Sequence, residues 1–220
     1  MATLVTGGVG FVGANIVKEL ARAGHQVVSL DLNGPDRLVE DFVRDQAPRV
    51  TFAVGDILDR AAVERMLESA VWAPNHRMTE PWRFFVLDKD SQARKKAADL
   101  AYEFALERSG NERRAEGTRQ AVASPPVLMY VYYIPGPSDE ATRENYAAVC
   151  CAVQNMSLAG VAEGLAVTWE TGGATRHPKL AETLGAEEDW LMAGMLSLGV
   201  SDEQADSRRT PASNFVNWLP

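Results

Sequence analysis

The sequence predicts an α/β protein in which a short βαβαβ unit precedes a larger α+β domain. Two observations predict this class. Short β-branched runs alternate with stretches of helical spacing over the first 60 residues, and this regular alternation is lost afterwards. The chain has 220 residues, of which 46% are hydrophobic and 24% are charged. This is the composition of an ordinary globular protein that is long enough to bury a sizeable core.

The first 60 residues carry the βαβαβ pattern. We expect strands at 2–6, 26–32 and 49–56, because each run is apolar and rich in β-branched residues. Helices are expected between them, at 11–25 and at 35–46, the second of which begins at a proline. Strands that alternate with helices in this way predict parallel pairing with right-handed crossovers.

The rest of the chain predicts a longer and less regular series of elements. The unbroken apolar run at 124–136 indicates a strand buried on both faces, and the small apolar residues of 139–165 indicate a central buried helix. The polar stretch 111–124 is expected to be irregular or a mobile cover. The other expected elements are helices at 59–73, 91–110 and 179–186, strands at 82–88 and 189–200, and a strand-to-loop passage at 167–178.

A glycine-rich loop, TGGVGFVG at 6–13, lies between the first expected strand and the first expected helix. In that context Gly7 permits a tight turn, Gly10 lets the backbone approach a pyrophosphate, and Gly13 lets the helix and strand pack closely. Asp31 ends the second strand, where a carboxylate accepts hydrogen bonds from a ribose. These features predict a dinucleotide site that prefers NAD.

Residues 1–60 resemble the opening of the extended short-chain dehydrogenase/reductases, the NAD-dependent epimerase/dehydratase family. The resemblance implies a half Rossmann unit, in which Asp56 and Ile57 hold the adenine-contacting position after the third strand. That family also uses a tyrosine with a lysine four residues later for proton transfer. No tyrosine of this chain has a lysine at that spacing.

Four later passages resemble a different family, the flavin-dependent nitroreductases of the short, minimal type. They are ESAVWAPNHRMTEPWRFFVL (68–87), SPPVLMYVYY (124–133), AVQNMSLAGVAEGLAVTWETGG (152–173) and LGAEEDWLMAGMLSLGV (184–200). Their order and rough spacing also match that family. Together the two resemblances divide the chain into a half Rossmann NAD-binding-like unit at 1–58 and a nitroreductase-like flavin domain at 59–220.

The nitroreductase resemblance implies an FMN site at the interface of a homodimer. Hydride transfer would run from NAD(P)H through the flavin N5 to a nitroaromatic or quinone-like acceptor, so no catalytic side-chain nucleophile and no metal site are expected. Some residues of the 73–76 stretch would reach the partner's cofactor. The positions that match the family's cofactor contacts are Trp72, Pro74, Asn75, His76, Trp169, Glu170, Thr171 and Gly172, with Arg208 and Arg209 toward the FMN phosphate.

The family's usual amino-terminal Arg-Arg-Ser-like cluster, which clamps the FMN phosphate, has no counterpart in this chain. Bidentate arginine contacts to phosphate are strong and geometrically specific, so we expect weakened FMN affinity. Arg208, Arg209 or the helix amino terminus at Gly10–Gly13 would have to replace the clamp.

Composition excludes several other functions. The formal net charge is −8, which disfavours nucleic acid and anionic membrane surfaces as partners. No apolar run approaches the roughly 20 residues of a membrane helix. The only cysteines, Cys150 and Cys151, are adjacent and indicate reduced thiols in a cytoplasmic protein. The polar tail that ends with Phe215 and Trp218 is expected to dock onto its own domain or a partner subunit.

Three alternatives stay open at this point. The chain is a non-catalytic NAD-binding module, or an inactive fusion in which neither site is complete, or its strands form one continuous doubly wound sheet without a domain boundary. At the level of single residues, Trp82 is expected to be a core aromatic, His76 has the simpler interpretation of a surface histidine, and Arg208 and Arg209 that of a solvated pair.

Overall fold

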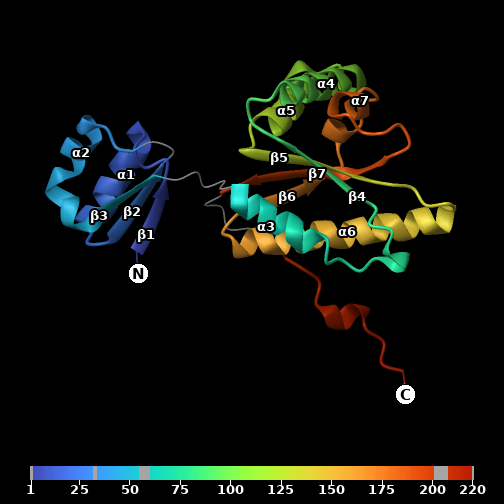
Figure 1. Cartoon of the computed structure of the whole chain (residues 1–220). Helices are drawn as coiled ribbons and strands as arrows, with labels where there is room; N and C mark the ends of the chain where they lie inside the picture. Colours follow the sequence, from blue (N-terminus) through green and yellow to red (C-terminus); the bar gives the residue numbers. More distant parts are fainter. Residues whose placement is uncertain (1, 32–33, 55–59, 201–207, 220) are drawn as a thin grey trace.

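The computed structural model describes residues 2–31, 34–54, 60–200 and 208–219. Its strands form two separate sheets, one of three strands and one of four (Figure 1). The two sheets share no hydrophobic core. The three-stranded sheet has one core, made of buried residues between positions 5 and 43, and the four-stranded sheet has two, made of buried residues between positions 62 and 198. The alternative of one continuous sheet is therefore wrong.

The three-stranded sheet is parallel, as predicted, with the order β1-β2-β3. Its strands are β1 (Ala2–Thr6), β2 (Gln26–Asp31) and β3 (Val50–Val54), and its helices are α1 (Phe11–Arg22) and α2 (Arg37–Val43), the latter followed by the 3-10 helix η1 (Arg44–Arg49). Both helices cover the same face (Figure 1). Val17 and Ala21 of α1 pack there against Val5 and Val27.

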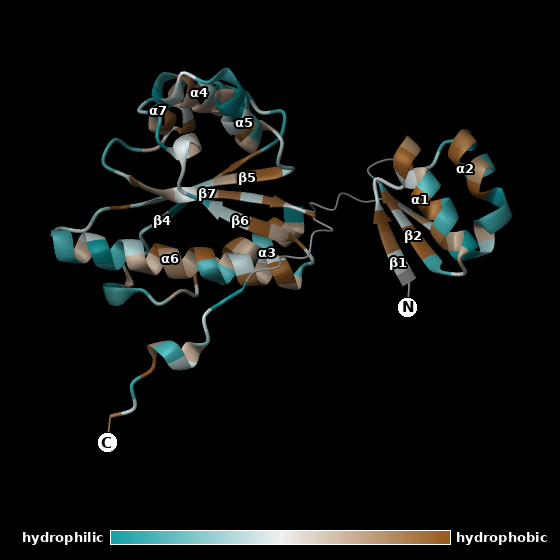
Figure 2. Ribbon diagram, turned by 180° about the vertical axis from the view of Figure 1, so that it is seen from behind, coloured by the Kyte–Doolittle hydropathy of each residue, from teal (hydrophilic) through white to brown (hydrophobic). Residues whose placement is uncertain are grey.

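The four-stranded sheet is antiparallel throughout, with the order β4-β5-β7-β6. Its strands are β4 (Trp82–Leu87), β5 (Val127–Tyr133), β6 (Ala166–Glu170) and β7 (Leu191–Gly199). Residues 128 to 132 of β5 are all buried, which confirms the strand covered on both faces. Figure 2 shows the apolar colouring along this strand.

Helices cover both faces of this sheet (Figure 1). On one face lie α3 (Arg60–Ala70) and α6 (Asp139–Ala162), and on the other lie α4 (Gln92–Ser109), α5 (Glu112–Ala123) and the short α7 (Leu180–Leu184). Met129 and Val131 of β5 belong to the core on the α3/α6 side, and Leu128 and Tyr130 to the core on the other side. The alternation of strand side chains thus builds the two cores. Trp82 is buried, as expected.

A buried arginine ties the α4/α5 layer to the sheet. Arg94 is 1% exposed, and its guanidinium donates hydrogen bonds to the carbonyl oxygens of Val122 (3.0 Å), Leu87 (3.3 Å) and Pro126 (3.3 Å), and also to that of Pro125. Carbonyl dipoles from three segments therefore solvate the charge in place of water. The inward orientation of Arg94 could not be predicted from the charged pattern of α4.

Two expectations for the helices were wrong. Residues 112–123 form the regular helix α5, because Asn111 caps it by accepting a hydrogen bond from the backbone N–H of Arg114 (3.0 Å) and because Ala115 and Val122 are fully buried on one side. The long helix α6 is not buried all round. Its solvent side leaves Leu158 60% exposed and Val161 65% exposed, since a single helical layer buries only the face toward the sheet.

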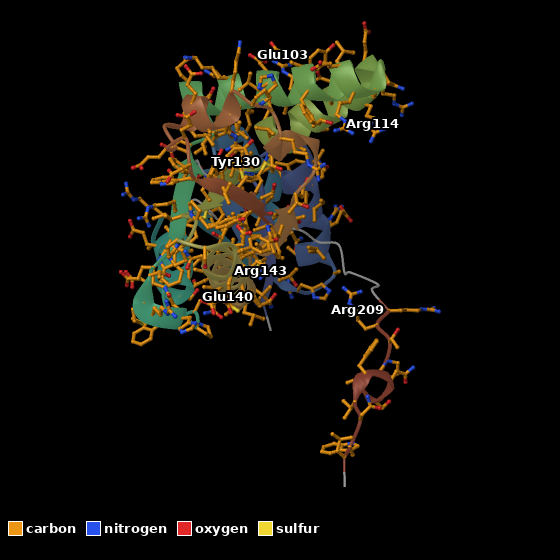
Figure 3. All side chains as sticks on the ribbon, turned by 90° about the vertical axis from the view of Figure 1, so that its right-hand side faces the viewer. Glu103, Arg114, Tyr130, Glu140, Arg143 and Arg209 are labelled. Atoms are coloured by element: carbon orange, nitrogen blue, oxygen red, sulfur yellow. The ribbon has the colours of Figure 1, made fainter. Side chains whose placement is uncertain are left out.

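Within the described residues no helix is long and apolar enough to cross a membrane. The carboxy-terminal segment contains one 3-10 helix, η4 (Ala212–Phe215), and its aromatic residues Phe215 and Trp218 are 74% and 91% exposed. The expected docking of this tail is therefore not seen within the described part of the single chain. Figure 3 shows Arg209 on this segment and Tyr130 in the interior of the sheet domain.

Candidate functional site

The loop after α3 presents the first group of predicted cofactor contacts. Backbone hydrogen bonds from Trp72 to Ser69 and from Ala73 to Ala70 end the helix. Ala73 is buried and anchors the loop, whereas Trp72 is 83% exposed. An indole of this size that faces solvent in a single chain has most of its apolar area available for a ligand or a partner.

Polar contacts hold the rest of this loop against α6. Oδ1 of Asn75 accepts a hydrogen bond from the backbone N–H of Thr79 (2.9 Å). The Thr79 hydroxyl donates a hydrogen bond to Oδ1 of Asn145 on α6 (2.8 Å). His76 places Nδ1 2.9 Å from Oε1 of Glu144. The Nδ2 group of Asn75 is buried and has no hydrogen-bond partner in the described part of the chain. A buried donor of this kind is costly unless a ligand or partner satisfies it.

The second predicted group lies at the end of β6. Trp169 pairs with Leu196 of β7, and its indole lies against Gly194, where a Cβ would stand 2.9 Å from Cδ1 of Trp169 and 2.8 Å from the carbonyl oxygen of Glu170. Gly194 also has a φ of +151°, which side chains other than hydrogen rarely allow. The absence of a side chain at Gly194 therefore allows the Trp169 indole to lie close to β7.

The chain then turns through Thr171 and Gly172 into the 3-10 helix η3 (Gly173–Thr175). The Thr175 hydroxyl donates to the carbonyl oxygen of Gly172 (3.0 Å), and Nε of Arg176 donates to that of Thr171 (3.3 Å). This turn carries the segment across the sheet edge to the α4/α5 layer, with which η3 is in contact.

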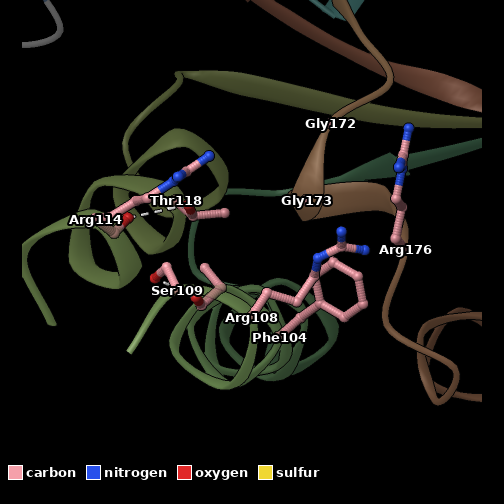
Figure 4. Close-up of a pocket in the computed structure, with 9 residues that line it drawn as sticks. Phe104, Arg108, Ser109, Arg114, Thr118, Gly172, Gly173 and Arg176 are labelled. Atoms are coloured by element: carbon pink, nitrogen blue, oxygen red, sulfur yellow. Dashed lines mark hydrogen bonds between the residues drawn. The ribbon is translucent and has the colours of Figure 1, made fainter. Parts of the chain in front are cut away.

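A pocket of about 360 Å³ opens where this turn meets α4 and α5. Figure 4 shows arginines from three different elements around it. Arg108 comes from α4, Arg114 from α5 and Arg176 from the segment after η3. The residues that matter most for its chemistry are Phe104, Arg108, Arg114, Gly172, Gly173 and Arg176.

The predicted flavin contacts are divided between the two layers of one chain, because Trp169 pairs with Leu196 of the core on the α3/α6 side whereas Gly172 lies toward α4 and α5. The 72–76 loop follows α3 and is held by α6, whereas Gly172 and Gly173 line the pocket with α4 and α5. Among the described residues no hydrogen bond, ion pair or ring contact joins the two groups. A single chain therefore does not assemble them into one site.

The glycine-rich loop has the predicted strand-to-helix geometry. Gly7 has a φ of +67°, and a Cβ on Gly13 would stand 2.7 Å from the carbonyl carbon of Gly7, so helix and loop pack as closely as expected. Asp31 accepts a hydrogen bond at Oδ2 from the backbone N–H of Val9 (3.1 Å), and Gly10 donates to the carbonyl oxygen of Gly7 (3.1 Å). Two N–H groups of the loop are thus used inside it.

The remaining predicted residues are less informative. Arg208 and Arg209 are exposed in the carboxy-terminal segment, where Arg209 donates only to the carbonyl oxygen of Arg208 (3.4 Å). Asp56 and Ile57 lie outside the described residues. The sequence patterns do not predict the roles of Arg108, Arg114 and Arg176. Arg114 lies in the polar stretch 111–124, whose composition predicts a cover rather than the wall of a pocket, and Arg108 and Arg176 carry no local signal.

Comparison with known proteins identifies the family that this fold and these segments define. The model of the nitroreductase family matches residues 51–200, more than half of the chain. The chain therefore belongs to the nitroreductase family. It is 26% identical over 153 residues to a putative NAD(P)H nitroreductase of Bacillus subtilis, a match that spans 69% of this chain and 79% of that protein.

Solved structures agree on the fold. A nitroreductase-like family protein from Bacillus cereus superposes with a TM-score of 0.64 at 27% identity, covering 74% of this chain and 86% of that one. A putative nitroreductase from Desulfovibrio desulfuricans, solved in complex with FMN, superposes with a TM-score of 0.57 at 22% identity and covers 76% of this chain and 88% of that one. At 22% identity, the second match supports only the fold.

The amino-terminal segment matches a second family. The model of the NAD-dependent epimerase/dehydratase family matches residues 3–74. The UDP-glucose 4-epimerase of Haemophilus influenzae is 40% identical over 68 residues, which cover 30% of this chain but only 20% of that enzyme. Both resemblances found in the sequence are thereby confirmed.

Proposed function

We propose that the protein is an FMN-dependent NAD(P)H oxidoreductase that reduces nitroaromatic or quinone-like acceptors. One observation carries the proposal: the turn after Trp169, which matches the family's flavin-contacting segment, borders a pocket of ligand size through Gly172 and Gly173, and this pocket would receive the acceptor beside the flavin. A bound FMN would supply hydride transfer at its N5. The chain's own residues would bind, orient and shield the reactants, so no side-chain nucleophile is needed.

The residues present fit a flavin. Gly172 and Gly173 bring backbone without side chains to the turn that follows Trp169, which suits the close approach of a flat ring. Asn75 offers a buried Nδ2 donor without a partner in the described residues, and Trp72 offers an exposed indole. Trp169 and Glu170 would support the ring from β6. His76, held by Glu144, and Pro74 would shape the loop that closes over it.

The placement of these two groups supports a homodimer. The 72–76 loop and the Trp169 side chain both face the α3/α6 side of the sheet, but no contact joins them among the described residues, so a second copy docked on this side would bring its own 72–76 loop to Trp169. The α3/α6 layer offers an apolar surface for this contact, because Trp72, Leu158 and Val161 are all more than half exposed.

Replacement of Leu158 by glutamate tests the dimer. The Leu158→Glu variant should elute as a monomer in size-exclusion chromatography with light scattering and should lose FMN. Leu38→Glu is the matched control, because Leu38 is also exposed (78%) but lies on α2 of the other sheet. A dimer that survives Leu158→Glu would contradict this interface.

The phosphate of the cofactor needs a partner, because the family's amino-terminal clamp is missing. We propose Arg208 and Arg209 for this role, since both are exposed cations and Arg209 donates only to the adjacent carbonyl in the described part of the chain. The amino terminus of α1 is the alternative, because Gly10 caps it without a side-chain bond and its first turn has no acidic residue. Flavin content of Arg208→Gln/Arg209→Gln and of Gly10→Val separates the two.

An absorbance spectrum tests the main proposal. Purified protein would be mixed with excess FMN, desalted, and scanned for bound flavin, and NADH consumption would then be followed with a nitroaromatic or a quinone. Retained flavin and acceptor-dependent NADH consumption are expected. A protein that stays colourless after reconstitution would overturn the proposal.

A second candidate function is an NAD-binding module at residues 1–58. The geometry of the glycine-rich loop favours it, since Gly7, Gly13 and Asp31 adopt the arrangement expected of a dinucleotide-binding turn. A cavity of about 410 Å³ borders the same loop between α1 and α2. NAD should raise the melting temperature of the protein in the absence of FMN if this function exists.

We further propose that the chain divides into two domains, 1–58 and 59–220, because the hydrophobic cores of the two sheets share no residue. Limited proteolysis should release a stable fragment that begins near residue 59. We also propose a cytoplasmic location, since Cys150 and Cys151 are both free thiols in the structure.

A further inference from the structure

The three arginines of the pocket have no acidic partners. Arg108, Arg114 and Arg176 form no ion pair with any carboxylate of the described residues. Nε of Arg176 donates to the backbone of Thr171, and the Arg108 guanidinium lies over the ring of Phe104, with its carbon 5.6 Å from the ring centroid. Neither contact neutralises the charge.

Two acidic side chains of the same helices are engaged elsewhere. Glu103 lies 3.8 Å from Nε2 of His177, and Glu116 accepts a hydrogen bond from Gln120 (2.6 Å) and lies 3.7 Å from Arg119. The chain as a whole carries a formal charge of −8. A concave site that gathers three cations on such a protein attracts an anion, and guanidinium groups bind carboxylate and phosphate in particular.

The shape of the pocket limits the kind of anion. Its volume of about 360 Å³ is at the lower end of the range for ligand pockets, which suits a single-ring molecule better than a dinucleotide. Phe104 provides an aromatic wall, and Gly172 and Gly173 place the pocket beside the turn assigned to the flavin. Figure 4 shows Phe104 and Arg108 together on one side of that turn.

We propose that this pocket binds the anionic group of a small aromatic electron acceptor, so that the preferred acceptors are nitroaromatics or quinones that carry a carboxylate rather than neutral ones. Arg108 and Arg114 would hold the carboxylate while Phe104 contacts the ring. This inference rests on the proposed oxidoreductase function, but the binding site itself exists in the protein whether or not FMN is present.

Calorimetric titration with benzoate tests the site directly. Benzoate should bind the wild-type protein with and without FMN, and Arg108→Gln or Arg114→Gln should each weaken the affinity about tenfold, which corresponds to about 1.4 kcal/mol. Arg113→Gln is the matched control, because Arg113 is an exposed neighbour on α5 that does not line the pocket. It should change the affinity less than twofold. Arg176 is left intact, because it also supports Thr171.

A second measurement concerns the acceptor. In the FMN-loaded protein, kcat/KM for 4-nitrobenzoate should exceed that for nitrobenzene, and Arg108→Gln should lower the ratio of the first value to the second about tenfold. The control Arg113→Gln should change neither value more than twofold. Melting temperatures of all variants check that they are folded.

Several results would overturn the inference. They are failure of benzoate to bind, equal weakening by Arg113→Gln, loss of FMN in Arg108→Gln, and binding of inorganic phosphate as tightly as benzoate with the same arginine dependence. Loss of FMN would assign the pocket to the cofactor, and the phosphate result would assign it to a phosphate-bearing ligand. If the protein takes up no FMN but still binds benzoate through the arginines, the proposed oxidoreductase function fails and the anion site stands.

Discussion

Replacement of Gly194 by alanine tests whether the packing of Trp169 on β7 supports both the stability of the sheet and the predicted flavin contact. The new Cβ would stand 2.8 Å from the Glu170 carbonyl oxygen, 2.9 Å from Cδ1 of Trp169 and closer still to the indole nitrogen. Ordinary contacts begin at 3.4 Å, so β6 and the indole have to move by at least about 0.5 Å. The φ of +151° at this position adds backbone strain for any residue with a Cβ.

The expected cost is the sum of these two effects. Overpacking costs about 1–3 kcal/mol, and a strained backbone residue costs on the order of 1–3 kcal/mol. We therefore expect Gly194→Ala to lose roughly 2–6 kcal/mol of unfolding free energy. For a protein of this size that is a fall of roughly 4–24 °C in melting temperature.

Chemical denaturation, tryptophan fluorescence and flavin content measure the effect together. Gly117→Ala is the matched control, because Gly117 lies exposed inside α5 with nothing within 4 Å of its Cβ position. That change should stabilise the protein by about 0.5–1 kcal/mol, since glycine is a poor helix former. If Gly194→Ala unfolds at the wild-type denaturant concentration and retains the wild-type flavin content, the packing of Trp169 on β7 supports neither the stability of the sheet nor flavin binding.

Three further predictions concern other parts of the molecule. Arg94→Met should lose at least about 3 kcal/mol in guanidinium unfolding, because four carbonyl oxygens lose a buried charged donor, and a loss below 1 kcal/mol would contradict that role. Gly13→Val should selectively raise hydrogen exchange in residues 2–54, because its Cβ meets Gly7 and Gly8, and uniform protection in the two sheets would refute this. Burial raises the pKa of Tyr132 to about 12, so the native state keeps a proton that the unfolded state releases above pH 10. The unfolding free energy should therefore fall by up to about 1.4 kcal/mol per unit between pH 10 and 12. Tyr132→Phe should flatten this slope in urea titrations between pH 10 and 12, and an unchanged slope would exclude Tyr132 as a source of it.

The sequence by itself determined the local features of this protein. The glycine-rich loop and the strands depend on backbone preferences of neighbouring residues, so periodicity and turn residues were enough to predict them. The burial of β5 on both faces also follows from its unbroken apolar run. The nitroreductase passages kept enough residues, such as those of the 68–87 segment, to identify the family by resemblance.

Only the tertiary structure decided which charged and polar residues meet. Arg94 and Arg108 lie on the same helix, yet one is buried among carbonyls and the other lines an open pocket. The helix α5 was missed because its stabilising residues, Ala115 and Val122, gain their energy from contacts with α4 and the sheet rather than from local propensity. The separation of Trp72 and Gly172 onto opposite layers likewise depends on chain topology. Long-range packing sets these relations, and a one-dimensional pattern of residues does not record it.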